Sequence, residues 1–191
     1  AKTRGTREWS GKNVNIQIGC EHGCRYCYAR YNAVCRFKRC TAEQWANPQV
    51  DRAKVHREYR RVDTTVMFPS SHDITPHNLC DCFLVLRKLL RAGNRVLIVS
   101  KPHLECVRIL LEGLADWRRQ IEFRFSITTA DPSARAFWEP AAPTYAERID
   151  CLAAAAKAGY PTSVSIEPVL DTTVPAILAA AAEWTNEIWV G

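Results

Sequence analysis

Strand-like and helix-like stretches alternate along this chain, and their order constrains the fold more than any other feature. Six stretches rich in apolar and β-branched residues are predicted as strands: 14–19, 64–68, 95–100, 121–129, 162–167 and 187–190. The stretches between them have helical periodicity over 29–61, 79–91, 106–117, 145–158 and 174–184. Consecutive strands separated by helices are parallel and joined by crossovers. The sequence therefore predicts an α/β fold built on a parallel sheet.

Three of the predicted strands alternate between polar and apolar residues. In 121–129, charged and hydroxyl residues at the even positions oppose Ile and Phe at the odd positions, and 14–19 and 162–167 alternate similarly. A doubly wound sheet, covered by helices on both faces, has strands that are apolar throughout. The alternation instead favours a partial, open (β/α) barrel of about six parallel strands around a wet interior. Its site is expected at the carboxyl ends of the strands.

The chain length predicts one domain. With 191 residues it is long enough for one core and short for two, so residues 1–191 are expected to form a single unit. The longest apolar stretch, 174–182, is about half the ~20 residues that span a bilayer. The basic N-terminus lacks the apolar core of a secretory signal, which predicts a cytoplasmic protein. The chain ends directly after the last strand, so we expect a truncated or minimal version, or a partner covering that sheet edge.

Nine cysteines require an explanation in a chain without an export signal. Their odd number argues against a disulfide framework. Cys20, Cys24 and Cys27 crowd into one loop after the first predicted strand. The cysteines from Cys80 onward lie among apolar residues, and most of them are predicted to be buried. Three thiolates on a tight loop can hold one metal centre.

The number of thiolates in this loop favours a particular kind of centre. A structural zinc normally takes four protein ligands, and here His22, Cys35 or Cys40 could supply the fourth. A four-iron cluster held by only three thiolates leaves one iron open to a substrate or cofactor. The place of the loop, at the carboxyl end of a predicted barrel strand, favours the open cluster.

The cysteine loop also resembles a known family. Cys-x3-Cys-x2-Cys, with Tyr26 before the last cysteine, resembles the signature of the radical S-adenosylmethionine (radical SAM) superfamily. The wider string 19–30, Gly-Cys-Glu-His-Gly-Cys-Arg-Tyr-Cys-Tyr-Ala-Arg, resembles its spore-photoproduct-lyase-like or "DNA repair photolyase" branch. The stretches 126–131, 139–143 and Glu167-Pro168 resemble the same branch. The resemblance extends from about Asn15 to the end of the chain.

The resemblance implies two cofactors and a reaction type. Cys20, Cys24 and Cys27 would hold a four-iron, four-sulfur cluster whose free iron chelates the amino and carboxylate groups of S-adenosylmethionine (SAM). One electron, from a flavodoxin- or ferredoxin-like donor, would split the sulfonium and give a 5′-deoxyadenosyl radical that removes a hydrogen atom from substrate. The enzyme would be of the lyase or transferase type.

The resemblance also implies contacts to SAM. Tyr26 would lie beside the adenine, although a packing ring under the loop is an equal alternative. Lys101, at the end of the third strand, would pair with the SAM carboxylate. The SAM amino group would be contacted by Ser70 or Ser71, with His72 and Asp73 as further candidates. Ser126 and Thr128 would contact the carboxylate or the ribose. Glu167 would contact the ribose or the substrate. Glu139 could close the site and pair with Arg148.

One departure from the family limits the implied reaction. Spore photoproduct lyases carry a cysteine in the loop after the second strand, where this chain has Phe68-Pro69-Ser70-Ser71. The repair reaction is therefore not implied here. Cys35 and Cys40 are expected to be free thiols on a basic helical segment, with hydrogen-atom donation or a second centre as the alternative.

The basic charge is concentrated in the first third of the chain. Residues 1–62 hold 14 Lys and Arg against 5 Asp and Glu, whereas residues 63–191 hold 12 against 15. Arginines and aromatic residues interleave over 25–61, which favours a nucleic-acid substrate. Alternatives are a peptide or protein substrate, a solvated helix face, a non-enzymatic nucleic-acid-binding module stabilised by zinc or a cluster, and one part of a larger assembly.

Overall fold

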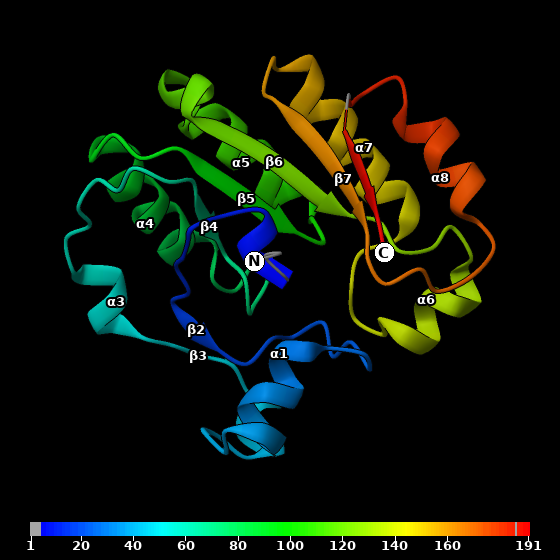
Figure 1. Ribbon diagram of the computed structural model, residues 1–191, viewed down its shortest axis with the longest axis horizontal. Coiled ribbons are helices and arrows are strands. Elements are labelled where there is room, and N and C mark those ends of the chain that lie inside the picture. Colours follow the sequence, from blue (N-terminus) through cyan, green and yellow to red (C-terminus); the bar gives the residue numbers. More distant parts are fainter. Residues whose placement is uncertain (1–4, 186) are drawn as a thin grey trace.

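The main feature of the computed structural model, which describes residues 5–185 and 187–191, is a six-stranded parallel sheet (Figure 1). In spatial order the strands are β1 (Lys12–Asn13), β4 (Val66–Phe68), β5 (Val96–Ser100), β6 (Ile121–Ser126), β7 (Thr162–Ile166) and β8 (Ile188–Val190). The end strands β1 and β8 pair only with β4 and β7, so the sheet stays open. The predicted α/β partial barrel is confirmed.

The longer helices lie together on one side of the sheet, which we call the outer face (Figure 1). They are α4 (Leu79–Arg91), α5 (Leu104–Gly113), α7 (Tyr145–Lys157) and α8 (Val174–Ala181). The inner face looks toward the N-terminal segment and the shorter helices (Figure 1). The shorter helical elements are α1 (Tyr28–Arg30), the π-helical turn Tyr31–Arg36, α2 (Ala42–Ala46), α3 (Arg52–His56), α6 (Pro132–Trp138) and the 3₁₀ turns Gly5–Glu8 and Ala115–Gln120.

The outer face holds the hydrophobic core. Phe123 and Phe125 of β6 are fully buried in one cluster with apolar residues of α4, α5 and α7. The register Val66↔Val96↔Ile121 keeps the core side chains of three strands level. The alternation predicted over 121–129 is therefore confirmed over the observed strand, 121–126, because a strand with one buried face has a period of two. The expectation that most of the later cysteines are buried is confirmed, because Cys82, Cys106 and Cys151 are buried and Cys80 is exposed.

The inner face divides into two halves. In the half near the amino ends of the strands, Arg124 is 4 % exposed and pairs with Glu122 (3.1 Å) and Glu187 (2.8 Å). The rings of Trp9 and Trp189 lie 4.8 Å and 5.2 Å from its guanidinium carbon. The expected wet interior is therefore wrong around Arg124, which Trp9 and Trp189 cover, whereas the side chains of Glu122 and Glu187 are 38 % and 52 % exposed. Polar side chains face a cavity only near the carboxyl ends.

The first predicted strand differs from the observed one. Lys12–Asn13 enters the sheet as β1, whereas Gln17–Ile18 (β2) leaves it and pairs antiparallel with Gln49–Val50 (β3). Gly19 has φ +92° directly after β2, and a Cβ there would lie 2.4 Å from the Trp45 carbonyl oxygen. The chain therefore turns away from the sheet before the cysteines begin.

The region predicted to be helical over 29–61 is helical only in pieces and contains the strand β3. The segment forms short elements that begin at separate N-caps: Thr41 makes a capping box with Gln44 before α2, and Asp51 accepts from the Lys54 amide before α3. Side-chain caps stabilise local helix starts and interrupt a continuous helix. Helix α6 was not predicted, although Asp131 and Pro132 supply its N-cap and first position.

No helix among the described residues is both long and apolar enough to cross a bilayer. Strand β8 forms one edge of the sheet, and Val190 at its end is 54 % exposed. Coverage of this edge by a partner or a further segment, and the organisation of residues 1–191 as a single domain, stay predictions.

Candidate functional site

A cavity of about 720 Å³ lies at the carboxyl ends of β4 to β7. Cavities of several hundred Å³ are typical of small-molecule and cofactor sites. Its walls bring together segments from the whole chain, and Cys20, Cys24 and Cys27 all line it. The polar side chains facing it include Ser70, Ser71, Lys101, Ser126, Ser165 and Glu167.

The cysteine loop, residues 20–27, is fixed to the segment that follows β6. The Arg25 amide donates to the Trp138 carbonyl at 2.9 Å, and the Ala141 amide donates to the His22 carbonyl at 3.2 Å. Gly23 has φ +63°, in the left-handed region where glycine is favoured. At the end of the loop, Cys27 caps α1, and its sulfur accepts from the Arg30 amide at 3.4 Å. The three thiols therefore project from a loop that is fixed at both ends.

Burial makes two of these thiols hard to ionise. It raises the pKa of Cys20 to about 12, with a further contribution from the Asp73 carboxylate, and it raises the pKa of Cys24 to about 11. A thiolate is the form that binds metal, so a cationic centre would replace these protons. Three thiols beside a cavity, one buried and two half-buried, thus fit an iron–sulfur cluster, which binds them as thiolates.

The spacing of the three sulfurs is wider than a lone zinc ion requires. Zinc–sulfur bonds of about 2.3 Å place the sulfurs of a tetrahedral site about 4 Å apart. Within the part of the chain that the structure describes, Cys20, Cys24 and Cys27 do not form a group whose ligand atoms lie within 4.8 Å of one another. In a four-iron cluster each thiolate binds a different iron, which requires wider spacing.

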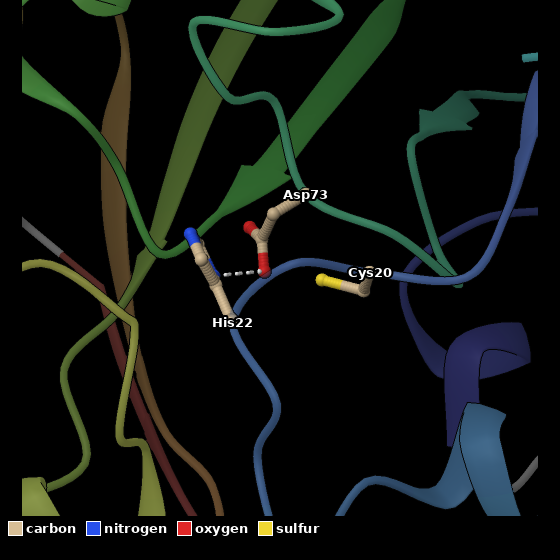
Figure 2. A group of neighbouring side chains, drawn as sticks. All are labelled: Cys20, His22 and Asp73. Carbon is tan, nitrogen blue, oxygen red and sulfur yellow. Dashed lines mark hydrogen bonds and ion pairs between the residues drawn. The ribbon is translucent and has the colours of Figure 1, made fainter. Parts of the chain in front are cut away.

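Asp73 connects the cysteine loop to β5, although the sequence suggested it as a contact to the SAM amino group. Its Oδ2 lies 3.0 Å from Nδ1 of His22 (Figure 2). Its Oδ1 accepts from the Ser100 hydroxyl and the Lys101 amide, both at 2.7 Å. Burial would raise the pKa of Asp73, but His22 and these donors hold it far below its usual range. The carboxylate considered as a contact to the SAM amino group is already engaged by the protein.

Lys101 extends from the end of β5 into the cavity. Its Nζ lies 5.6 Å from the centre of the Tyr26 ring. No carboxylate of the described residues lies within 4 Å of this ammonium. Burial would lower its pKa, but Tyr26, Cys24 and Asp73 raise it well above the ordinary value. The cavity thus contains a charged ammonium available to an anionic ligand.

Glu139 joins the cysteine loop to the helical layer. It is fully buried and forms an ion pair with Arg148 of α7, which is 1 % exposed. It also accepts hydrogen bonds from the Tyr26 hydroxyl and, at 2.8 Å, from the Thr128 hydroxyl. The expected pairing of Glu139 with Arg148 is present. Thr128 requires correction, because it is fully buried against Glu139 and does not line the cavity.

The loop after β4 is held by a residue of the N-terminal strand region. Asn15 Oδ1 accepts from the amides of Ser70 (2.7 Å) and Ser71 (2.9 Å), and its Nδ2 donates to the Ser70 hydroxyl at 2.9 Å. His72 accepts from the Ile16 amide, and burial lowers its pKa, so it clamps the loop as a neutral ring. The two serines line the cavity, as expected, and His72 lines it too, with its ring held by hydrogen bonds within the protein.

The rest of the cavity wall contains two residues that the sequence predicted for the site and an N-terminal segment that it did not. Ser126 and Glu167 line the cavity from β6 and the end of β7, and Glu167 accepts from the Ser165 hydroxyl at 3.1 Å. Gly5, Thr6, Glu8 and Trp9 line it as well. The only signal of this role in the sequence is Trp9, an aromatic residue in an otherwise polar N-terminal stretch.

The basic segment presents aromatic rings at the surface after the cysteine loop. Tyr31 is 63 % exposed and Phe37 is 50 % exposed. The guanidinium carbons of Arg36 and Arg39 lie 5.0 Å and 4.9 Å from the Phe37 ring centre. Cys35 is exposed and, like Cys40, does not line the cavity.

Comparison with known proteins supports this view of the fold. The chain is 27% identical over 170 residues to the uncharacterized protein ORF301 of Acidianus two-tailed virus, covering 83% of this chain and 56% of that protein. Two mutant structures of spore photoproduct lyase superpose with a TM-score of 0.56. One, with bound AdoMet and a dinucleoside spore photoproduct, is 19% identical and is matched over 82% of this chain and 45% of its own. The other, a cysteine-to-serine mutant, is 20% identical, with 88% and 48% covered.

This chain thus spans about half the length of the proteins it matches, and the likeness to the solved structures shows a shared fold. Family membership rests on a broader match. The model of the radical SAM superfamily matches residues 14–175, which include the cysteine loop and β4 to β7. The chain therefore belongs to the radical SAM superfamily, whose cofactors are a four-iron, four-sulfur cluster and S-adenosylmethionine.

Proposed function

We propose that this chain is a radical SAM enzyme whose cluster is held by Cys20, Cys24 and Cys27, with SAM bound in the adjoining cavity. When bound, the cluster would supply the one electron that splits the sulfonium of SAM into methionine and a 5′-deoxyadenosyl radical, which would take a hydrogen atom from substrate. The observation that carries the proposal is the single cavity lined by three cysteines and a charged lysine. An electron donor of the flavodoxin or ferredoxin type would supply the reducing equivalent.

The cavity offers a distinct partner for each charged or polar part of SAM. Lys101 would pair with the carboxylate, because its ammonium lacks an ion pair among the described residues. Ser70 and Ser71 would contact the amino group from a loop that Asn15 holds in place. Ser126 and Glu167 would contact the ribose.

The adenine would lie beside Tyr26, which faces the cavity while its hydroxyl is fixed by Glu139. Burial raises the pKa of this phenol, so the ring stays neutral. An aromatic face held in one orientation is a suitable stacking surface for a purine.

The test is cofactor assembly and SAM cleavage in the absence of oxygen. Protein purified anaerobically is expected to be brown and, with dithionite and SAM, to release 5′-deoxyadenosine. Cys27→Ala is expected to abolish both, whereas Cys80→Ala, which alters an exposed thiol on α4, is expected to retain both. A colourless wild-type protein that holds one zinc ion would contradict the proposal.

We further propose a nucleic-acid substrate, for which the surface beside the cysteine loop is the support. Exposed aromatic rings flanked by arginines, as at Phe37, are suited to stacking on bases and pairing with phosphates. The spore photoproduct lyase structure that holds a dinucleoside photoproduct is a protein of the same fold. A peptide or protein substrate is the second candidate.

Salt dependence of oligonucleotide binding distinguishes these substrates. Each arginine–phosphate pair that a substitution removes is expected to reduce the slope of log affinity against log salt by about 0.7 for a single strand. The double variant Arg36→Gln/Arg39→Gln should therefore reduce the slope by about 1.4. The matched double variant Arg95→Gln/Arg119→Gln removes two exposed charges at the amino ends of β5 and β6 and should leave it unchanged. Equal effects of the two variants would favour the peptide alternative.

A further inference from the structure

Cys20, His22 and Asp73 converge on one buried point from two separate segments (Figure 2). One potential ligand atom of each residue lies within 4.8 Å of the other two, and Nδ1 of His22 is 3.0 Å from Oδ2 of Asp73. His22 is 1 % exposed and Asp73 is 9 % exposed. We propose that these three side chains bind one divalent transition-metal ion when the cluster is absent. This inference rests on the proposed function in one respect, because the ion and the proposed cluster share Cys20 as a ligand.

The surroundings of this group, which we call the Cys–His–Asp set, match those of a metal site. Ligating histidines donate their second ring N–H to an acceptor, and ligating carboxylates are hydrogen-bonded through their other oxygen. Nε2 of His22 lies 3.0 Å from Nε2 of His103. Oδ1 of Asp73 accepts from the Ser100 hydroxyl and the Lys101 amide. Both outer contacts are already in place, and Nδ1 and Oδ2, which contact each other at 3.0 Å, are the atoms that an ion would bind in place of that contact.

The proton positions are consistent with metal binding. In the metal-bound form the single proton of the His22 ring lies on Nε2 and is donated to Nε2 of His103, which carries its own proton on Nδ1. Nδ1 of His22 then gives its lone pair to the ion, and the Cys20 thiol releases a proton to solvent as its thiolate binds. The charges of one thiolate and one carboxylate balance those of a divalent ion.

The chemistry of the donor set indicates which ions fit. Thiolate, imidazole and carboxylate together suit zinc, cobalt(II) or iron(II) with one further position open. Bonds of about 2.0 to 2.3 Å require donor atoms roughly 3.3 to 3.8 Å apart, which is within the 4.8 Å that bounds the separations in this set. Because the same sulfur serves the cluster, an ion in this set must leave before the cluster is complete.

The test uses the full chain, stripped of metal with a chelator and titrated anaerobically with Co²⁺. One Co²⁺ per chain is expected, with thiolate-to-cobalt absorption in the near ultraviolet. Asp73→Asn and His22→Asn keep polar groups of similar size but replace good ligands, and each is expected to weaken binding at least tenfold. Ser100→Ala removes one hydrogen bond to Asp73 and is expected to weaken binding about tenfold, as the removal of outer contacts does.

The matched control is the double variant Cys24→Ser/Cys27→Ser. It removes two cluster ligands, leaves the Cys–His–Asp set intact, and is expected to bind Co²⁺ as tightly as the wild type. The inference is overturned if the wild type binds no Co²⁺, or if this double variant loses binding while His22→Asn and Asp73→Asn keep it. Circular dichroism tests whether each variant is folded. The double variant decides the question even if Asp73→Asn does not fold.

Reconstitution of the wild type with iron and sulfide separates this inference from the proposed function. Prior loading with zinc is expected to slow cluster assembly, because Cys20 is occupied. A chain that assembles a cluster but binds no Co²⁺ overturns the inference alone. A chain that binds Co²⁺ through the Cys–His–Asp set but never assembles a cluster overturns the proposed function alone.

Discussion

The two faces of the sheet perform different tasks, although they are built from alternate residues of the same strands. On the outer face, Phe123 and Phe125 pack with α4, α5 and α7 and are fully buried. On the inner face, Ser126, Ser165 and Glu167 line the cavity. Stability should therefore depend mainly on the outer face and cofactor binding mainly on the inner one. The difference shows how a parallel sheet keeps a polar site beside a close-packed core.

Glu139 is the exception, because it connects the two faces. Its ion pair with Arg148 ties it to the outer helix α7, and its hydrogen bond from Tyr26 ties it to the cysteine loop. Both charged residues are almost completely buried. Breaking this pair should therefore affect stability and the site together.

The largest effect is expected from Glu139→Gln. Neutralising one partner leaves the Arg148 guanidinium buried without a compensating charge, which destabilises proteins by about 3–5 kcal/mol. Urea unfolding of the cluster-free protein measures the destabilisation, and the iron content after reconstitution is expected to fall as well. Glu105→Gln, an exposed change on α5, serves as the control and should stay within about 0.5 kcal/mol. Equal stabilities of the two variants would show that Arg148 does not depend on Glu139.

The next effect belongs to the outer face alone. Leu86 of α4 is fully buried, and Leu86→Ala is expected to cost about 2–5 kcal/mol because it removes buried methyl groups and leaves a cavity. Leu84→Ala on the same helix, where the side chain is 45 % exposed, should cost much less. SAM affinity of the folded Leu86→Ala protein should match that of the wild type. A weakened affinity would mean that the two faces are coupled through more than Glu139.

The outer face was predictable because its signals are local. Alternation of side chains over 121–129 reports burial directly, since a strand has a period of two. The same alternation over 14–18 predicted a strand of the main sheet, which is wrong. Gln17–Ile18 pairs instead with Gln49–Val50, a partner about 30 positions away that local alternation does not reveal. Thr41 and Asp51 divide the region that was expected to be helical, and both are residue types that are favoured as N-caps. No glycine nearby marks the end of a preceding helix, so the division was missed.

The site was predictable where the chemistry is concentrated in one stretch. The cysteine loop and Lys101 at a strand end could be placed from sequence, and both line the cavity. The contact between His22 and Asp73 joins residues 51 positions apart, and the spacing of each gives no sign of the other. Thr128 was misplaced because the strand β6 ends at Ser126, so strand alternation no longer sets the direction of its side chain.

The third effect belongs to the inner face alone. Lys101→Met keeps the length of the side chain but removes the ammonium that we propose pairs with the SAM carboxylate. A hydrogen bond to a charged group is worth enough to predict a roughly 10- to 100-fold loss of SAM affinity. Anaerobic calorimetry of the cluster-loaded protein measures it, with the exposed Lys157→Met as control. An unchanged affinity would remove Lys101 from the proposed site.

The smallest effect is a dependence on pH, and it again involves the junction at Glu139. Burial would raise the pKa of Glu139, but Lys101 and Arg148 lower it below the ordinary value of 4.5. A carboxyl whose folded pKa is depressed contributes stability that is present above its unfolded pKa and is lost as the pH falls through the folded one. The stability difference between wild type and Glu139→Gln should therefore be constant near neutral pH and shrink below about pH 4.5. Urea unfolding of both proteins between neutral and acid pH measures this difference, and because Asp73 titrates in both proteins its contribution cancels. A difference that grows in acid would show that Glu139 is protonated in the folded protein and that Arg148 is held by the Pro143 and Ser126 carbonyls instead.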